Sequence, residues 1–299
     1  MSASSEVFYA ETPTRRFARG FVQSRLALTG FVIFALMALL ALAAPLVSPQ
    51  NPYDLAEISI ADAVLPPGSV GSSGMIHLLG TDSQGRDMLS AILFGLRISM
   101  AVGLSSVFIA MSVGLCVGLC AGYFGGRVDG FIMRIVDVQL SFPALLIGLV
   151  VVSVLGSGTL NLILALVIVQ WAYFARTARA SALVEREKEY LVAARCLELG
   201  GWRIVFRHLL PNCIPPTLVV VTIATAASIS LEATLSFLGI GLPVTEPSLG
   251  MLIAGGFDWM ISGAYWISVF PGVVLLITVA SINMAGDRVR DLLNPRLQR

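Results

Sequence analysis

The stretch LALTGFVIFALMALLALAAPLV, residues 26–47, contains no charged side chain and decides the fold class. A helix needs about 20 apolar residues to cross the roughly 30 Å hydrocarbon core of a bilayer, and this stretch is long enough. Five more apolar stretches follow, at 98–123, 135–155, 160–174, 214–238 and 265–285. The pattern predicts an all-α membrane protein with six transmembrane helices.

The first stretch also has features of a cleaved secretion signal, because it ends in ALAAP after a basic region. The apolar core of such a signal has about 7 to 15 residues, and this stretch is longer. We therefore expect an uncleaved first span.

The composition of the whole chain excludes several classes of protein. Of its 299 residues, 57% are hydrophobic and 12% are charged, with a mean hydropathy of +0.87, whereas about 25% of residues are charged in ordinary soluble domains. The formal net charge of +1 supplies no positive field for nucleic acid. The single lysine, Lys188, stands in REKEY without preceding glycines, so the chain lacks the P-loop that holds a nucleotide phosphate.

Cysteine and histidine are too few and too scattered to predict a metal or redox site. The four cysteines include no C-x-x-C pair, and Cys116 and Cys120 lie one helical turn apart in an apolar run. His77 and His208 stand far apart in the sequence. We expect the cysteines to be small apolar filler and the chain to bind no metal.

The basic residues are distributed unevenly between alternate loops. With the N-terminus inside, all of the 19 Lys and Arg residues except Arg86 and Arg97 fall on the inner side. Cytoplasmic loops of membrane proteins carry an excess of Lys and Arg. The bias places both termini in the cytoplasm, with 1–25 as an N-terminal tail and 287–299 as a C-terminal tail.

The outer loop, 48–97, is too long to be a simple connector and contains HLLGTDSQGRDM, residues 77–88. Gly and Asp favour turns, because Gly adopts left-handed backbone and Asp side chains bond to nearby backbone. Arg86 between two aspartates indicates a structural ion-pair cluster, with direct contact to a substrate as the alternative. The candidate residues of this structural motif are Gly80, Asp82, Gly85, Arg86 and Asp87.

The inner loop, 175–213, carries the densest mixture of charges. Residues 181–199 and 202–210 are predicted to form two short helices, separated by Gly200-Gly201 and closed by Pro211, which together make an inner hairpin over 180–211. One interpretation is an amphipathic helix resting on lipid headgroups. The other is docking of a soluble partner, because consecutive small residues allow another backbone to approach closely. The candidate docking residues are Val192, Ala193, Ala194, Leu197, Glu198, Leu199, Gly200 and Pro211.

Two charged residues lie within the apolar stretches. Glu232 is toward the outer end of the fifth span and Asp137 is at the inner start of the third. Charge inside a membrane is costly and generally faces protein or water. A proton relay would indicate a secondary transporter, but no titratable chain connects the two positions. A place in the helix bundle or along a cavity is favoured.

The inner loop resembles the cytoplasmic motif of permease subunits of ATP-binding cassette (ABC) importers. That motif reads E-A-A-x-x-x-G, then nine residues, then I-x-L-P; here VAARCLE at 192–198 is followed by nine residues and HLLP at 208–211. Val192 replaces the Glu, Glu198 replaces the Gly and His208 replaces the Ile. Gly200 is expected to supply the glycine of the turn, two residues later.

Other segments resemble the dipeptide, oligopeptide and nickel branch of these permeases. HLLGTDSQGRDMLS at 77–90 is similar to the H-x-LGTD-x-x-GRD-x-x-S pattern of that branch. The resemblance continues in GYFGGRVDGFIMRIVD (122–137), FPALL (142–146), LSFLGIG (235–241), FPG (270–272) and GDRVRDLLNPRL (286–297). It covers nearly the whole chain, and the extra first span with its Pro-rich outer segment is similar to the C-type member of the permease pair.

The resemblance implies the type I ABC importer transmembrane fold with an extra N-terminal span, a five-span core over 98–286 and a non-catalytic role in transport. The implied partners are a second homologous permease in a heterodimer, two ABC ATPase subunits that bind ATP and Mg²⁺, an extracytoplasmic solute-binding protein and the lipid of the bacterial cytoplasmic (inner) membrane. No cofactor is expected on this chain. Di- or oligopeptides are the favoured solutes; nickel, another small solute or a gradient-driven secondary transporter are the alternatives.

Overall fold

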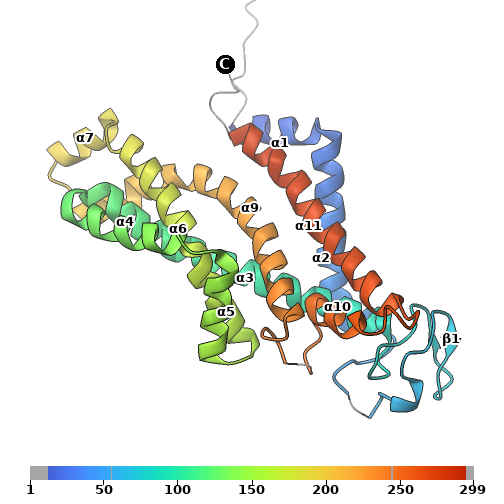
Figure 1. Ribbon diagram of the computed structural model, residues 1–299. Helices are drawn as coiled ribbons and strands as arrows, with labels where there is room; N and C mark the ends of the chain where they lie inside the picture. The colour runs from blue at the N-terminus through green and yellow to red at the C-terminus, as the bar shows by residue number, and fades with distance from the viewer. Residues whose placement is uncertain (1–12, 55, 244, 294–299) are drawn as a thin grey trace, which may run out of the picture.

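The computed structural model describes residues 13–54, 56–243 and 245–293, which are largely helical (Figure 1). In chain order the elements are α1 (Pro13–Val22), α2 (Arg25–Val47), η1 (Ile60–Asp62), β1 (Ser69–Val70), β2 (Ile76–His77), α3 (Met88–Phe124), α4 (Gly126–Leu140), α5 (Ala144–Leu155), α6 (Thr159–Glu185), α7 (Glu189–Cys196), α8 (Gly201–Arg203), η2 (Ile204–Leu209), α9 (Leu210–Phe237), α10 (Leu249–Phe257) and α11 (Trp266–Leu293). Among these residues, five helices are long and apolar enough to cross a membrane, and α4 with α5 makes a sixth span if the bent pair is counted as one. The predicted all-α membrane fold is confirmed.

The third predicted span, 135–155, is broken rather than straight. α4 ends at Leu140, α5 begins at Ala144, and the two helices are bent by 93°. Pro143 caps α5 at this break. Proline has no N–H to donate and disfavours helical backbone in the residue before it, so a helix does not run through this point.

The helix that contains the second predicted span, 98–123, starts ten residues before it, because α3 begins at Met88. Asp87 precedes it as the N-cap, with a carboxylate that accepts a hydrogen bond from the Ser90 N–H. Arg97, which limited the apolar stretch in the sequence, is exposed on the helix surface and does not interrupt it. α3 is consequently longer than a membrane is thick, and its first turns support the outer loop.

α3 crosses the centre of the molecule, and α6 packs along it (Figure 1). Gly114, Gly118 and Gly122 follow one another at intervals of four residues on the contact face. A Cβ atom at Gly114 would stand 2.4 Å from the carbonyl oxygen of Trp171, and one at Gly118 would stand 2.3 Å from that of Ala175. Lipid provides no hydrophobic drive for association, so close backbone contact between small residues holds such helices together.

α2 packs against α11 on one side and exposes the other (Figure 1). Gly30 makes the close approach possible, since a Cβ atom there would lie 2.8 Å from the Ser281 carbonyl oxygen. The exposed face carries Leu39, Leu42 and Leu46. An apolar exterior of this kind is stable in lipid and not in water.

The second helix of the inner hairpin does not end at Pro211, contrary to prediction. α8, the π-helical turn η2 and α9 form one continuous helical stretch, Gly201–Phe237. Proline removes a backbone hydrogen bond and crowds the carbonyl of the preceding turn, and a wider π-helical turn just before it accommodates this mismatch. The inner hairpin therefore continues into the fifth span without a break.

Candidate functional site

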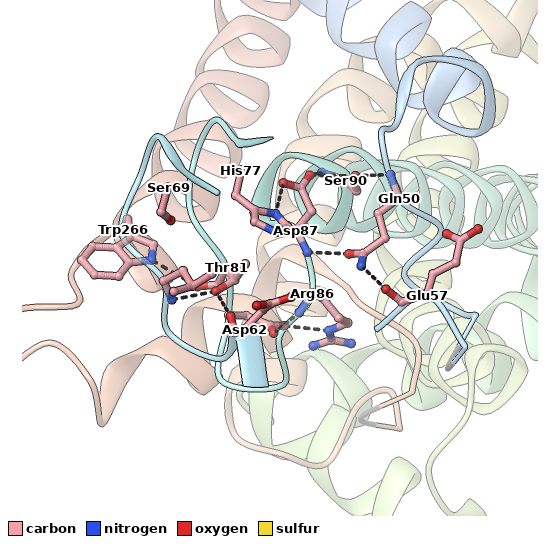
Figure 2. A network of polar contacts seen from close by, with 12 residues as sticks. Gln50, Glu57, Asp62, Ser69, His77, Thr81, Arg86, Asp87, Ser90 and Trp266 are labelled. Carbon is pink, nitrogen blue, oxygen red and sulfur yellow. Dashed lines mark hydrogen bonds and ion pairs between the residues drawn. The ribbon is translucent and has the colours of Figure 1, made fainter. Parts of the chain in front are cut away.

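The outer loop folds over the start of α3 with its polar side chains pointing inward (Figure 2). Two short strands pair antiparallel in this loop, with Ser69 opposite His77 and Val70 opposite Ile76. The buried polar side chains of the loop are Gln50, Asp62, His77, Thr81, Asp82, Arg86 and Asp87. Burial of polar groups is tolerated where hydrogen bonds replace those to water. The hydrogen-bond partners of each group therefore show whether it stabilises the loop.

Asp87 joins three segments of the chain (Figure 2). One carboxylate oxygen accepts from the backbone N–H and the hydroxyl of Ser90, both at 2.8 Å, and the other lies 3.0 Å from Nδ1 of His77. The Asp87 N–H donates to Oε1 of Gln50 at 2.7 Å, and the Gln50 N–H donates to the Ser90 hydroxyl. Asp87 thus ties the end of α2 to the start of α3.

Asp82 and Arg86 form a second cluster within the loop. Nε of Arg86 lies 2.6 Å from one carboxylate oxygen of Asp82, while the other oxygen accepts from the N–H groups of Gln84 and Arg86. Gly80 and Gly85 have φ of +79° and +82°. A Cβ atom at Gly85 would lie 2.0 Å from the backbone of the preceding loop, so this turn requires glycine.

The outer loop is also fixed to α11 through Thr81. Nε1 of Trp266 donates to the carbonyl of Thr81 at 3.1 Å, and the Thr81 hydroxyl donates to the Asp62 carbonyl at 2.6 Å (Figure 2). The residues that the sequence singled out in this loop therefore hold the loop together and anchor it on α2, α3 and α11.

The inner hairpin contains one short helix, α7, where the sequence predicts a longer one over 181–199. α6 extends to Glu185, and the chain then breaks before α7 begins at Glu189. Leu191 and Ala194 turn toward the body of the protein and pack with Ile204, Leu209 and their neighbours. The hairpin is thus attached by one narrow apolar face.

The predicted docking residues divide between two faces of the hairpin. Ala194 is 5% exposed and belongs to the attachment face, so it is unavailable to a partner. Val192 is 47% exposed and Leu197 is 74% exposed. The remaining members are exposed, except Leu199, which is half-buried; these are Ala193, Glu198, Gly200 and Pro211.

The turn after α7 is formed by Glu198 and not by Gly200. Glu198 has φ of +52°, the left-handed region that favours glycine, whereas Gly200 has φ of −55°. The turn therefore stays at the position where the ABC permease motif has glycine. Its left-handed backbone strains a residue with a Cβ atom.

Tyr190 secures the hairpin from the side opposite the turn. Its hydroxyl donates to Glu185 at 2.8 Å and accepts from Nδ2 of Asn212 at 3.1 Å. Burial, followed by the hydrogen bond and the negative charge of Glu185, raises the pKa of Tyr190 to about 12. The neutral phenol is therefore part of the folded hairpin.

An aromatic cluster that the sequence did not indicate braces the same region. Tyr123, Phe124, Trp202 and Phe206 contact one another in series, with ring centroids 5.1 to 5.8 Å apart. Arg195 of α7 lies over the Tyr123 ring, 5.6 Å from its centroid. Tyr123 and Phe124 are distant in sequence from Trp202 and Phe206, and the two pairs come together only where the end of α3 meets α8 and η2.

Glu232 lies inside the helix bundle. Its side chain is 0% exposed, and one carboxylate oxygen accepts from the Ser236 hydroxyl at 2.8 Å. The hydroxyls of Ser99 in α3 and Ser248 at the start of α10 also face this carboxyl group. Glu232 therefore sits where α3, α9 and α10 meet.

Asp137 has a different setting from Glu232. One carboxylate oxygen lies 2.5 Å from a guanidinium nitrogen of Arg176 in α6, and both side chains are more than half exposed. Arg176 in turn lines a groove between α5, α6 and α9. Asp137 thus lies at the edge of this groove.

The α5–α6–α9 groove has a volume of about 740 Å³. Its polar lining residues are Gln170, Tyr173, Arg176, Thr177, Ser230 and Thr234. Sequence reasoning missed Gln170, although a lone amide in the apolar run 160–174 is a signal, since polar groups at membrane depth are costly.

A bundle of apolar spans with a protruding hairpin at one end, a closed loop at the other and a partly polar groove defines a membrane transport subunit. Two family models match the chain. Residues 114–299 match the binding-protein-dependent transport system inner membrane component, and residues 12–67 match the N-terminal TM domain of oligopeptide transport permease C. The chain belongs to the family of binding-protein-dependent transport system inner membrane components and is a permease subunit of an ABC importer.

Proteins with similar sequences extend over the full length of the chain. It is 36% identical to the Di/tripeptide transport system permease protein DppC of Pseudomonas aeruginosa, over 99% of this chain and 96% of that protein. It is 35% identical to the Dipeptide transport system permease protein DppC of Haemophilus influenzae, over 100% of both. The Escherichia coli K12 protein of the latter name is 37% identical over 96% of this chain and 94% of its own.

The fold is similar to that of a solved transporter. An inward facing conformation of the MetNI methionine ABC transporter covers 69% of this chain and 97% of its own, with a TM-score of 0.56 and 22% identity. This likeness confirms the predicted type I importer fold, to which the chain adds an N-terminal span. A permease of such an importer works with ATPase subunits and a solute-binding protein in the inner membrane of a bacterium.

Proposed function

We propose that the chain is the C-type permease subunit of an importer of di- or oligopeptides, with both termini in the cytoplasm. The observation that carries this proposal is its full-length similarity to relatives named for dipeptide or di/tripeptide transport. A second homologous permease completes the pathway in a heterodimer. Two ATPase subunits bind ATP and Mg²⁺, while this chain binds no cofactor and catalyses no reaction.

The exposed face of the inner hairpin docks to an ATPase subunit in this proposal. Leu197 and Val192 present apolar surface beyond the attachment face, and apolar patches left exposed in this way mark interaction sites. Closure of the ATPase dimer on ATP moves the hairpin, and the continuous helix 201–237 moves with it. Such rigid-body movement switches the groove between the two sides of the membrane.

A charge at the tip of the hairpin tests this docking. We expect Leu197→Glu to reduce co-purification of the ATPase subunits by more than tenfold and to abolish uptake of a labelled dipeptide, because a carboxylate in an apolar contact loses its hydration. The amount of permease in the membrane should stay unchanged, since Leu197 is exposed. Ile60→Glu, at an exposed apolar residue of the outer loop, is the matched control and should leave both readouts intact.

Two results would contradict the proposal in different ways. Uptake that persists without any ATPase and follows a proton or sodium gradient indicates a secondary transporter. Accumulation of nickel in place of the dipeptide keeps the ABC permease and replaces its solute.

A further inference from the structure

The α5–α6–α9 groove differs in chemistry from the faces that suit lipid. The exposed face of α3 carries Phe108, Ile109 and Val113, and that of α2 is equally apolar. The groove instead carries an amide, a phenol, a guanidinium group and three hydroxyls among its lining residues. Polar groups at membrane depth face protein or a water-filled path rather than lipid.

Gln170 is the polar residue of the groove that the fold does not satisfy. Its side chain is 5% exposed, and neither Nε2 nor Oε1 has a hydrogen-bond partner in the described part of the chain. Buried polar groups are nearly always paired, so an unpaired amide requires an explanation. Gln170 is one of the residues that line the groove, so a ligand bound there lies next to its side chain.

The hydroxyl groups of the groove are prepared to accept hydrogen bonds. Thr177 donates to the carbonyl of Tyr173 at 3.0 Å, and Thr234 donates to the carbonyl of Ser230 at 2.8 Å. Ser230 donates in the same manner to its own helix. Each hydroxyl hydrogen is thereby engaged, and the oxygen keeps a lone pair for a donor from outside.

The groove therefore offers what a peptide main chain needs. A peptide bond carries one N–H and one C=O, and both must find partners when they leave water. Gln170 supplies two N–H donors and one acceptor, and the hydroxyl oxygens supply further acceptors. The groove volume of about 740 Å³ is within the range of small-molecule sites.

We propose that Gln170 hydrogen-bonds the main-chain amide of a peptide in the α5–α6–α9 groove, with its Oε1 accepting the peptide N–H. This inference rests on the proposed function, because it specifies how a peptide importer recognises its solute inside the membrane. Contacts to the main chain do not depend on the side chains of the peptide. The groove thus selects for peptide bonds and accepts varied sequences.

Replacement of the amide by an apolar group of similar length tests this role. The Gln170→Met transporter, complete with its partner permease, ATPase subunits and binding protein, is compared with the wild type in right-side-out vesicles. Two probes are used, alanyl-alanine and alanyl-N-methylalanine, which lacks the peptide N–H. We expect uptake of alanyl-alanine to fall about tenfold in the variant, since one hydrogen bond is lost.

The ratio of the two uptake rates separates the selectivity of the groove from the selectivity of the binding protein. The preference of the binding protein for one probe is the same in both transporters and cancels. The preference for alanyl-alanine should decrease about fivefold in Gln170→Met relative to the wild type. The melting temperature of the variant should be no lower, because the removed amide pairs with no described residue. Thr217→Val, buried in α9 with a bond to the Cys213 carbonyl, is the control and should resemble the wild type in both rates.

Three results would overturn the inference. Unchanged uptake and an unchanged ratio show that Gln170 does not contact the peptide. An equal fall for both probes shows that Gln170 serves the fold of the transporter. If the wild-type transporter imports neither probe, the proposed function of peptide import is itself contradicted. This outcome is distinguishable because it is seen before any substitution is made.

Discussion

The outer loop and the inner hairpin lie at opposite ends of the fold (Figure 1) and use polar and apolar side chains in opposite ways. In the outer loop, Asp82 and Asp87 are buried and each bonds several groups of the same chain. In the inner hairpin, Leu197 is apolar and exposed, and α7 is attached by one face only. Most buried polar groups of the first region are paired within the described chain, with Nε2 of His77 as an exception. The second region exposes apolar side chains of the kind that mark interaction sites.

The largest effect should follow from opening the outer loop. Asp87→Ala removes the N-cap of α3 and leaves His77 and Ser90 without their shared acceptor. We expect the free energy of unfolding to fall by about 3 kcal/mol, measured by thermal unfolding of the purified permease. Asp87→Asn retains an oxygen that caps the helix and should lose clearly less. Equal stability of Asp87→Ala and the wild type would show that the loop does not depend on its own polar contacts.

A smaller effect of opposite sign is expected in the inner hairpin. Glu198→Gly relieves the left-handed strain at φ of +52° and should stabilise the hairpin by about 1 kcal/mol, seen as slower proteolysis after α7. Gly200→Ala is the matched control, since its backbone is ordinary and a Cβ atom there contacts nothing. Destabilisation by Gly200→Ala together with no gain from Glu198→Gly would assign the turn to Gly200.

The smallest effect concerns the titration of Tyr190. Its pKa is raised from 10.0 to about 12, so the stabilisation is complete below pH 10 and is lost as the pH rises toward 12. We expect about 1 kcal/mol at most, because the ring is partly exposed. The difference in tyrosinate absorbance between the wild type and Tyr190→Phe should show a midpoint near 12. A midpoint near 10 would mean that the bond to Glu185 does not hold the hairpin.

Much of the fold was predictable because apolar length is a strong signal in a membrane. The spans that became α2, α6, α9 and α11 were found in this way. Hydropathy alone did not place the break between α4 and α5, because the apolar stretch 135–155 continues across Pro143. Only the proline itself, which favours a bend, marks this point in the sequence. Pro211 predicts the end of a helix that in fact continues, because a π-helical turn directly before it accommodates the proline.

The candidate sites were less predictable, because they depend on which face of a helix meets which neighbour. The sequence placed Arg86 between two aspartates, and the structure pairs it with Asp82 while Asp87 pairs with His77. It also could not separate Ala194 from Leu197, since only the packing of α7 against η2 shows which one is covered. Patterns in sequence thus identified regions, and tertiary contacts assigned their residues.

Because the helix continues through Pro211, the inner hairpin and the α9 wall of the groove are two ends of one helical stretch. The stretch Gly201–Phe237 contains 37 residues, which corresponds to about 55 Å of helix. The stretch curves (Figure 1), so a tilt of about 5° around one end displaces the other by at most roughly 5 Å, about the rise of one helical turn. Angular changes too small to disturb the packing at one end are thus magnified into a distance comparable to the width of a peptide backbone at the other.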